Sequence, residues 1–125
     1  MILDTNALSA IADGEPTATG QLTQGHEVSI PVIVLGEFRY GIARSRYRRQ
    51  YEDWLSDFLL VVQVIEIGEE TTPHYASIRV ELRESGTPVP ANDLWIAALC
   101  RQYARPILSR DRHFDVVNKL KRVEW

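Results

Sequence analysis

Short apolar runs alternate along the chain with longer segments in which apolar residues recur every three to four positions. The short runs predict strands, because they are bounded by turn-forming residues and the third is rich in β-branched residues. We expect these strands at residues 2–3, 28–30, 61–67 and 106–108, with a candidate edge strand at 122–124.

The longer segments predict helices. Their apolar spacing places helices at residues 6–12, 32–43, 46–60, 70–84 and 93–102, with a further short helix near 18–24. Tyr47, Tyr51, Trp54 and Phe58 share one face of the third helix. This face could form core or a dimer surface, and we expect core. The stretch from Leu94 to Cys100 is apolar on all sides, which is typical of a helix buried between layers.

Strands separated by helices imply parallel crossover connections, so the pattern predicts an α/β fold. We expect a central parallel sheet of four to five short strands with helices on both faces. No internal repeat or linker interrupts the 125 residues, and we therefore expect a single domain spanning residues 1–125.

Composition narrows the class of protein. A hydrophobic fraction of 45% and a charged fraction of 25% are those of a soluble globular protein. No apolar run approaches the roughly 18 residues of a membrane span, and no basic-then-apolar leader opens the chain, so we expect no membrane partner. The single cysteine, Cys100, cannot form an internal disulfide, which favours the cytoplasm.

Charge is distributed unevenly. The net charge of −3 argues against bulk electrostatic binding to nucleic acid, but residues 39–49 hold five arginines and no acid. Three interpretations stay open: a solvated helix face, a track for phosphate groups, or a docking surface for an acidic partner. The five residues are Arg39, Arg44, Arg46, Arg48 and Arg49.

Acids fall where a binding site is expected. In open parallel sheets the binding crevice lies beyond the carboxyl ends of the strands. Asp4 directly follows the first predicted strand, Asp111 lies just past the fourth, and Asp93 begins the all-apolar helix. Glu37 is an acid within the otherwise apolar stretch after Pro31.

Each acid alone has an ordinary explanation, as a turn residue, a helix-dipole partner worth about 0.3–1 kcal/mol, or a partner of a nearby arginine. Their coincidence favours a shared site. Gathered carboxylates repel one another unless a cation joins them, and oxygen ligands suit Mg²⁺ or Mn²⁺. The three histidines lack zinc-site spacing, and we interpret His113 as a hydrogen-bonding support.

Four stretches together carry a family resemblance: "MILDTN", "LGEFRYGI", "ANDLWIAA" and "LSRDRHFD". In this order, over nearly the whole chain, they resemble the PIN-domain ribonucleases, and among these the VapC-type toxins of type II toxin–antitoxin pairs. The resemblance implies a three-layer α/β/α PIN-like fold and an endoribonuclease that hydrolyses RNA phosphodiester bonds with Mg²⁺ or Mn²⁺.

The resemblance also implies roles for individual residues. The acidic quartet would be Asp4, Glu37, Asp93 and Asp111, with Asp4 and Asp93 as the principal metal ligands. Asn6 and Ser109 match polar positions that help order such a site. Many members carry one further acid. Here the residue two positions beyond Asp111 is His113 and the next acid is Asp115, so the number of metal ions stays open.

Partners follow from the same resemblance. They would be an RNA substrate and a small antitoxin that threads into the active-site groove, with the arginines contacting either one. A homodimer is implied, and a larger toxin–antitoxin assembly could bind operator DNA through the antitoxin.

Two alternatives have distinguishing features. A phosphatase of the haloacid-dehalogenase type needs a second aspartate where this chain has Asn6, and a lysine near the phosphate where the only lysines are Lys119 and Lys121. A non-catalytic PIN-like interaction module would keep the scaffold without the activity.

Overall fold

The computed structural model describes residues 1–25 and 27–125; His26, one of the histidines considered above, lies outside the described residues. A five-stranded sheet forms the centre, in the order β3-β2-β1-β4-β5, and every pair of neighbours is parallel. The strands are β1 (Ile2–Leu3), β2 (Ser29–Pro31), β3 (Gln63–Ile65), β4 (Ile107–Leu108) and β5 (Arg122–Val123).

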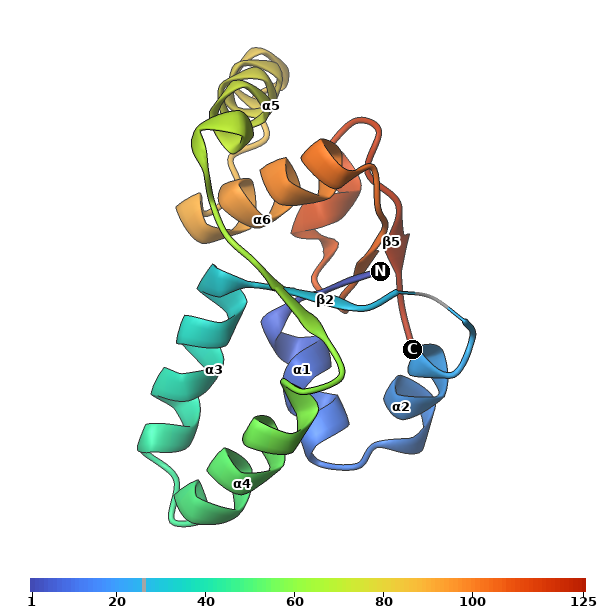
Figure 1. Ribbon diagram of the computed structural model, residues 1–125. Helices are drawn as coiled ribbons and strands as arrows, with labels where there is room; N and C mark the ends of the chain where they lie inside the picture. The colour runs from blue at the N-terminus through green and yellow to red at the C-terminus, as the bar shows by residue number, and fades with distance from the viewer. Residues whose placement is uncertain (26) are drawn as a thin grey trace.

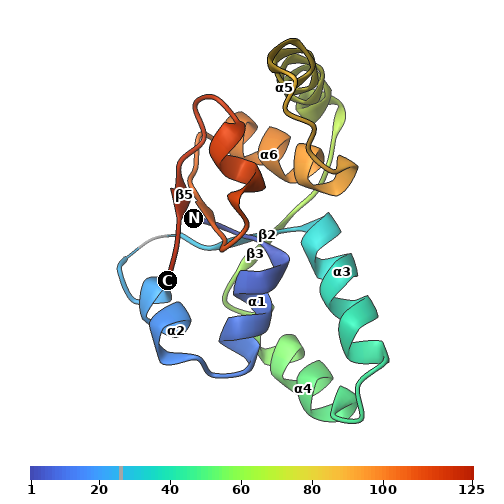
Figure 2. The ribbon, with the colours of Figure 1, turned by 180° about the vertical axis from the view of Figure 1, so that it is seen from behind.

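Helices cover both faces of this sheet, which confirms the predicted three-layer α/β/α architecture. Helices α1 to α4 lie on one side, while α5 and α6 lie on the other (Figures 1 and 2). The helices are α1 (Thr5–Ala12), α2 (Pro16–Leu22), α3 (Val32–Ala43), α4 (Arg48–Phe58), α5 (Thr72–Ser85) and α6 (Ala91–Tyr103), and two 3₁₀ turns are η1 (Glu69–Thr71) and η2 (Arg112–Val116).

The strand order reverses once, and this reversal positions the site. From β1 the chain adds β2 and then β3 on one side, then crosses the sheet to add β4 and β5 on the other side of β1. Because parallel crossovers keep one hand, the two directions place their helices on opposite faces. The carboxyl ends of β1 and β4 therefore border the crevice where a doubly wound sheet binds its ligand.

The central strands and α6 form the middle of the core. Both residues of β1 and both residues of β4 are fully buried. In α6 the run from Ile96 to Cys100 is buried throughout, as the all-apolar pattern predicts. Trp95 is half-buried and stacks on Tyr75 of α5, with ring centroids 4.0 Å apart.

Two predicted elements differ from the structure around α4. The strand expected at residues 61–67 is shorter, since Leu60 and Val61 are exposed and their amides bond back to Asp57 and Phe58 at the helix end. The helix expected from residue 46 begins at Arg48 instead. Tyr47 is half-exposed beneath the Arg46 guanidinium, which lies 5.0 Å from its ring centroid, so it is not a core residue.

Among residues 1–25 and 27–125, the structure contains no helix that is both long and apolar enough to span a membrane.

Candidate active site

Asp4 stands at the mouth of the sheet, between the end of β1 and the start of α1. It is the N-cap of α1, and its Oδ1 accepts a hydrogen bond of 2.8 Å from the Thr5 amide. Its Oδ2 accepts from the Ser109 hydroxyl at 2.6 Å and from the Asn6 side-chain amide at 3.2 Å. The side chain is almost fully buried, and its two oxygens accept three hydrogen bonds.

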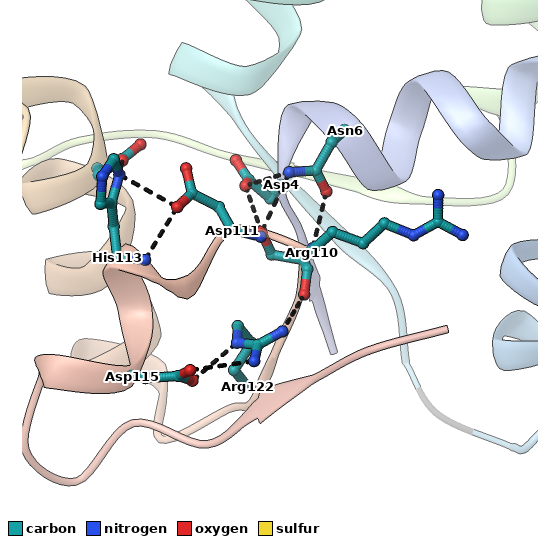
Figure 3. A network of polar contacts seen from close by, with 9 residues as sticks. Asp4, Asn6, Arg110, Asp111, His113, Asp115 and Arg122 are labelled. Atoms are coloured by element: carbon teal, nitrogen blue, oxygen red, sulfur yellow. Dashed lines mark hydrogen bonds and ion pairs between the residues drawn. The ribbon is translucent and has the colours of Figure 1, made fainter.

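Ser109 and Asn6 join the ends of β1 and β4. The Ser109 hydroxyl donates to Asp4 and also accepts from the Asp111 amide at 2.9 Å. The Asn6 side chain donates to Asp4, and its oxygen accepts from the Arg110 amide at 3.2 Å. Figure 3 shows these contacts as one polar network across the strand-order reversal.

Burial raises the pKa of Asp4, and the charges of Asp93 and Asp111 raise it further. The hydrogen bonds from Ser109 and Thr5 oppose that shift, because they favour the ionised form. Because the pKa of Asp4 is raised overall, a cation bound beside it would favour its ionised form.

Asp93, Asp111 and His113 form a second cluster next to Asp4. Asp93 lies in the first turn of α6, and Asp111 is the N-cap of η2. The Nδ1 atom of His113 is 3.1 Å from Asp93 Oδ2 and 3.1 Å from Asp111 Oδ1. One ligand atom from each of the three residues lies within 4.8 Å of the others.

The charges of this cluster influence one another. Burial raises the pKa of Asp93, the charges of Asp111 and Glu37 add to the rise, and the hydrogen bond with His113 opposes it. The hydrogen bond to Asp93 raises the pKa of His113, as does the negative charge of Asp111. The charges of the other acids thus reach both Asp4 and Asp93, whose pKa values they raise.

Glu37 approaches from the opposite side. It is exposed on α3, and its Oε1 accepts a hydrogen bond of 2.9 Å from the Thr5 hydroxyl. Thr5 and Glu37 both line a groove of about 300 Å³ between α1, α3 and α4, which continues to Ser45 beyond the end of α3. The groove thus ends at Glu37 and Thr5, the residue that follows Asp4.

Asp115 does not join the cluster. It forms a two-pronged ion pair with Arg122 of β5, with N···O distances of 2.7 and 3.0 Å. Arg122 also donates to the Ser109 carbonyl at 3.0 Å (Figure 3). The sequence analysis did not identify Arg122 as a residue that supports the site. The only signal for it was the candidate edge strand at 122–124, because pairing of this strand with the fourth strand brings Arg122 beside Ser109.

The arginine-rich segment lies away from the acids, beyond the far end of α3 (Figure 1). A helical rise of about 1.5 Å per residue separates Glu37 from Arg44 by about 10 Å along the axis. Arg48 pairs with Glu52 at 2.8 Å, and the Arg44 guanidinium lies 5.7 Å from the centroid of the Tyr40 ring. Arg39, on α3, is exposed and closer to the acids along the chain.

The donor set fits a divalent cation. Ligand atoms of Asp93, Asp111 and His113 lie within 4.8 Å of one another. Asp4 lies near enough for the charges of Asp93 and Asp111 to raise its pKa. Carboxylate oxygens are the ligands that Mg²⁺ and Mn²⁺ prefer. Cys100, the single cysteine of the chain, is buried in the core and does not offer the site a thiolate for a softer metal.

Comparison with known proteins agrees with this arrangement. The model of the PIN domain family matches residues 1–120, so the chain belongs to the PIN-domain family. This finding decides against the haloacid-dehalogenase alternative. Within that family the chain belongs with the VapC ribonucleases. It is 31% identical over 101 residues to Ribonuclease VapC2 of Rickettsia felis, covering 78% of this chain and 75% of that protein.

Further relatives extend the match to almost the whole chain. Ribonuclease VapC5 of Mycobacterium tuberculosis is 28% identical over 126 residues, covering 98% of this chain and 91% of that protein. The fold matches VapBC2 from Rickettsia felis bound to a DNA fragment from their promoter. That match has a TM-score of 0.89 at 25% identity and covers 99% and 97% of the two chains. DNA-bound VapBC from Salmonella typhimurium has a TM-score of 0.85 at 23% identity, over 99% and 96%.

Proposed function

We propose that this protein is a metal-dependent endoribonuclease, the toxin of a type II toxin–antitoxin pair. The observation that carries the proposal is the convergence of Asp4, Asp93, Asp111 and Glu37 at the strand-order reversal of a PIN-domain chain. The name Ribonuclease, which the relatives in Rickettsia felis and Mycobacterium tuberculosis bear, supports the same reaction class.

The four acids differ in burial, and we assign their roles in metal binding accordingly. Asp4 and Asp93, the less exposed of the four, would be the principal ligands of Mg²⁺ or Mn²⁺. When bound, such an ion polarises the scissile phosphate and lowers the pKa of a coordinated water. Glu37 and Asp111 are placed to complete the ligand set or to orient the water. Ser109 and Asn6 hold the Asp4 carboxylate in place and favour its ionised form.

Among the described residues, Cys100 and Ser109 are the candidate nucleophiles nearest in kind, and neither is placed to attack a substrate at the site. Cys100 is buried, and burial raises the pKa of its thiol so strongly that it stays protonated. The Ser109 hydroxyl donates to Asp4 and accepts from the Asp111 amide, so it is not directed at a substrate. Attack by a water molecule is the chemistry that this arrangement supports.

RNA would approach along the groove that Thr5 and Glu37 line. Because the acids repel phosphate, cations outside the site must hold the chain. Arg39 is the nearer candidate along α3, and Arg44, Arg46, Arg48 and Arg49 follow at its far end, where flanking nucleotides would pass. The same path suits an extended segment of an inhibitor protein, which would then use contacts meant for RNA.

The proposed partner is a small antitoxin. VapBC complexes from Rickettsia felis and Salmonella typhimurium, both bound to DNA, share the fold, and this supports an assembly that reaches operator DNA through the antitoxin. The homodimer implied by the resemblance stays a prediction. RNA cleavage and operator binding both fit a protein that acts in the cytoplasm, as does the free thiol of Cys100.

A cleavage assay tests the proposal. Purified protein is incubated with mixed cellular RNA in Mg²⁺ or Mn²⁺, alongside the variants Asp4→Asn and Asp93→Asn. We expect the parent protein to produce RNA fragments only when metal is present. Each variant loses a principal metal ligand, so its cleavage should fall to the background that the parent shows in excess chelator.

Asp53→Asn is the matched control, since Asp53 is an exposed acid of α4 outside the site, and it should cleave like the parent. Cleavage that persists in both active-site variants would contradict the metal assignment. No cleavage by the parent under any metal condition would favour the non-catalytic interaction module instead.

A further inference from the structure

We propose that His113 is itself a metal ligand, through Nδ1, and that the site is a mixed nitrogen–oxygen site that favours Mn²⁺ over Mg²⁺. This inference rests on the proposed function, because it concerns the ion that the acids would hold. It differs from the expectation at the sequence level, in which His113 only supports the site by hydrogen bonding.

The spacing of the donor atoms carries the proposal. His113 Nδ1 lies 3.1 Å from an oxygen of Asp93 and 3.1 Å from an oxygen of Asp111. In octahedral coordination with bonds of about 2.1 Å, adjacent ligand atoms lie about 3.0 Å apart. The nitrogen therefore keeps from each of the two carboxylates the separation that adjacent ligands of one ion would have, and all three ligand atoms lie within 4.8 Å of one another.

The local structure holds the imidazole in this position. His113 lies in η2, and its amide donates to Asp111 Oδ1 at 2.9 Å, which fixes the backbone beside the acid. The next residue, Phe114, is fully buried and anchors the turn in the core. Two residues on from His113, Asp115 is fixed by its ion pair with Arg122. These contacts fix the backbone that carries His113, so the imidazole starts from a defined position beside both acids.

The opposite role for His113 makes a different prediction. A protonated imidazole could serve as the internal counter-charge of Asp93 and Asp111, and an incoming cation would then have to displace it. In that case removing the side chain would strengthen metal binding. If the neutral imidazole is a ligand, removing it weakens binding and withdraws a nitrogen from the ion.

The ligand type determines the choice of metal. Mg²⁺ takes oxygen ligands and keeps much of its water, whereas imidazole nitrogen suits the transition metals. A site that replaces one carboxylate by an imidazole therefore loses part of its affinity for Mg²⁺ and keeps that for Mn²⁺. Restoring an acid at this position should move the preference back towards Mg²⁺.

Electron paramagnetic resonance of bound Mn²⁺ tests the proposal without RNA. The loss of free-ion signal gives the affinity, and pulsed spectra report ¹⁴N coupling from a directly bound imidazole. The parent protein is compared with His113→Ala and His113→Asp, and with His74→Ala as a matched control on α5. Circular dichroism checks that each variant is folded.

We expect ¹⁴N coupling in the parent and in His74→Ala, and none in either His113 variant. Mutating a residue that only hydrogen-bonds to a metal ligand typically lowers metal affinity about 10–100-fold. Loss of a direct ligand should cost at least as much, so His113→Ala should bind Mn²⁺ at least about tenfold more weakly. His113→Asp should still bind Mn²⁺, but Mg²⁺ should displace that Mn²⁺ at lower concentration than in the parent protein.

Parent protein that binds Mn²⁺ without nitrogen coupling, or a His113→Ala variant with equal or tighter binding, would overturn the assignment of His113 and leave the proposed function standing. Parent protein that binds no Mn²⁺ at all would overturn both.

Discussion

At the scale of single residues, Asp4 shows how the site balances opposing effects. Burial raises its pKa, while hydrogen bonds from Ser109, Thr5 and Asn6 hold its two oxygens. A buried carboxylate without those donors would take up a proton and lose its value as a ligand. The donors closest to Asp4 therefore matter as much as the acid itself.

Ser109→Ala tests this dependence. The variant removes the 2.6 Å bond to Asp4 and leaves the Asp111 amide without its hydroxyl acceptor. We expect a loss of about 1–3 kcal/mol in the free energy of unfolding, measured in urea, because buried polar groups lose a partner. The pKa of Asp4 should rise further, which ¹³C NMR titration would show.

Ser56→Ala is the control, since Ser56 is exposed on α4 and donates only to a backbone carbonyl. An Asp4 titration unchanged by Ser109→Ala would mean that the hydroxyl does not govern this carboxylate.

Sequence reasoning could place Asp4, Asp93 and Asp111 because strand ends and helix starts are readable from the hydrophobic pattern, whereas Glu37 stood out only as an acid in an apolar stretch. It placed His113 only as a hydrogen-bonding support, because the position of the ring between Asp93 and Asp111 depends on the 3₁₀ geometry of η2, which no periodicity marks. Arg122 was missed for a related reason. Its partners, Asp115 and the Ser109 carbonyl, become neighbours only when β5 pairs with β4.

At the scale of elements, η2 and β5 act as one unit through Arg122. The guanidinium joins Asp115 of η2 to the Ser109 carbonyl at the end of β4, and its side chain is largely buried. The segment that carries Asp111 and His113 is thus fastened at both ends, although η2 is a single short turn.

Arg122→Ala should loosen this segment more than it destabilises the protein. We expect faster amide hydrogen exchange in peptides covering residues 109–117, with exchange in α6 unchanged, because the core contacts of Phe114 stay in place. Lys121→Ala, an exposed neighbour, is the control. Equal protection of residues 109–117 in both variants would show that the ion pair does not hold the turn.

Helix α6 shows how a core element positions chemistry. Asp93 lies in its first turn, while Ile96 and Leu99 are fully buried beneath the sheet. The sequence predicted this burial correctly because apolar residues surround the helix. The overlong strand predicted at residues 61–67 failed because β-branched residues also occur at an exposed helix end.

Truncation in α6 should be costly. Ile96→Ala is expected to lower the free energy of unfolding by about 2–5 kcal/mol, since it leaves a cavity in the core. Val80→Ala, on the exposed face of α5, should change it by no more than about 0.5 kcal/mol. Urea denaturation measures both, and equal effects would contradict the assigned core.

At the scale of the whole molecule, charge is separated along α3. Glu37 lies midway along α3 and accepts a hydrogen bond from Thr5, next to Asp4, whereas the arginine-rich segment follows the C-terminal end of the helix (Figure 1). A net charge of −3 hides this separation. The fold was predictable at this scale because strands and helices alternate regularly, whereas the distance between the arginines and the acids required the structure.

Replacing Arg44, Arg46, Arg48 and Arg49 by glutamine tests whether this segment holds RNA. We expect weaker binding of a labelled single-stranded RNA in chelator, with a shallower salt dependence. Each lost phosphate contact should reduce the slope of log affinity against log salt by about 0.7. Fluorescence anisotropy at several salt concentrations measures it.

Arg79→Gln with Arg83→Gln is the control, because both arginines lie on α5, across the sheet from α3. A slope that stays the same after all four replacements would leave only docking of a partner or a solvated surface for this segment.

The strands β1 and β4 contain only two residues each, and all four are fully buried. With no surplus length, neither strand can absorb an added or lost residue by sliding, since a shift of one position turns every side chain to the opposite face. Insertions and deletions should therefore be excluded between Met1 and Asn6 and between Ile107 and Asp111. They should accumulate instead at turns such as Gly86, where helix α5 ends in the left-handed region. The segments that carry Asp4 and Asp111 are therefore fixed in length by the two shortest buried strands of the sheet.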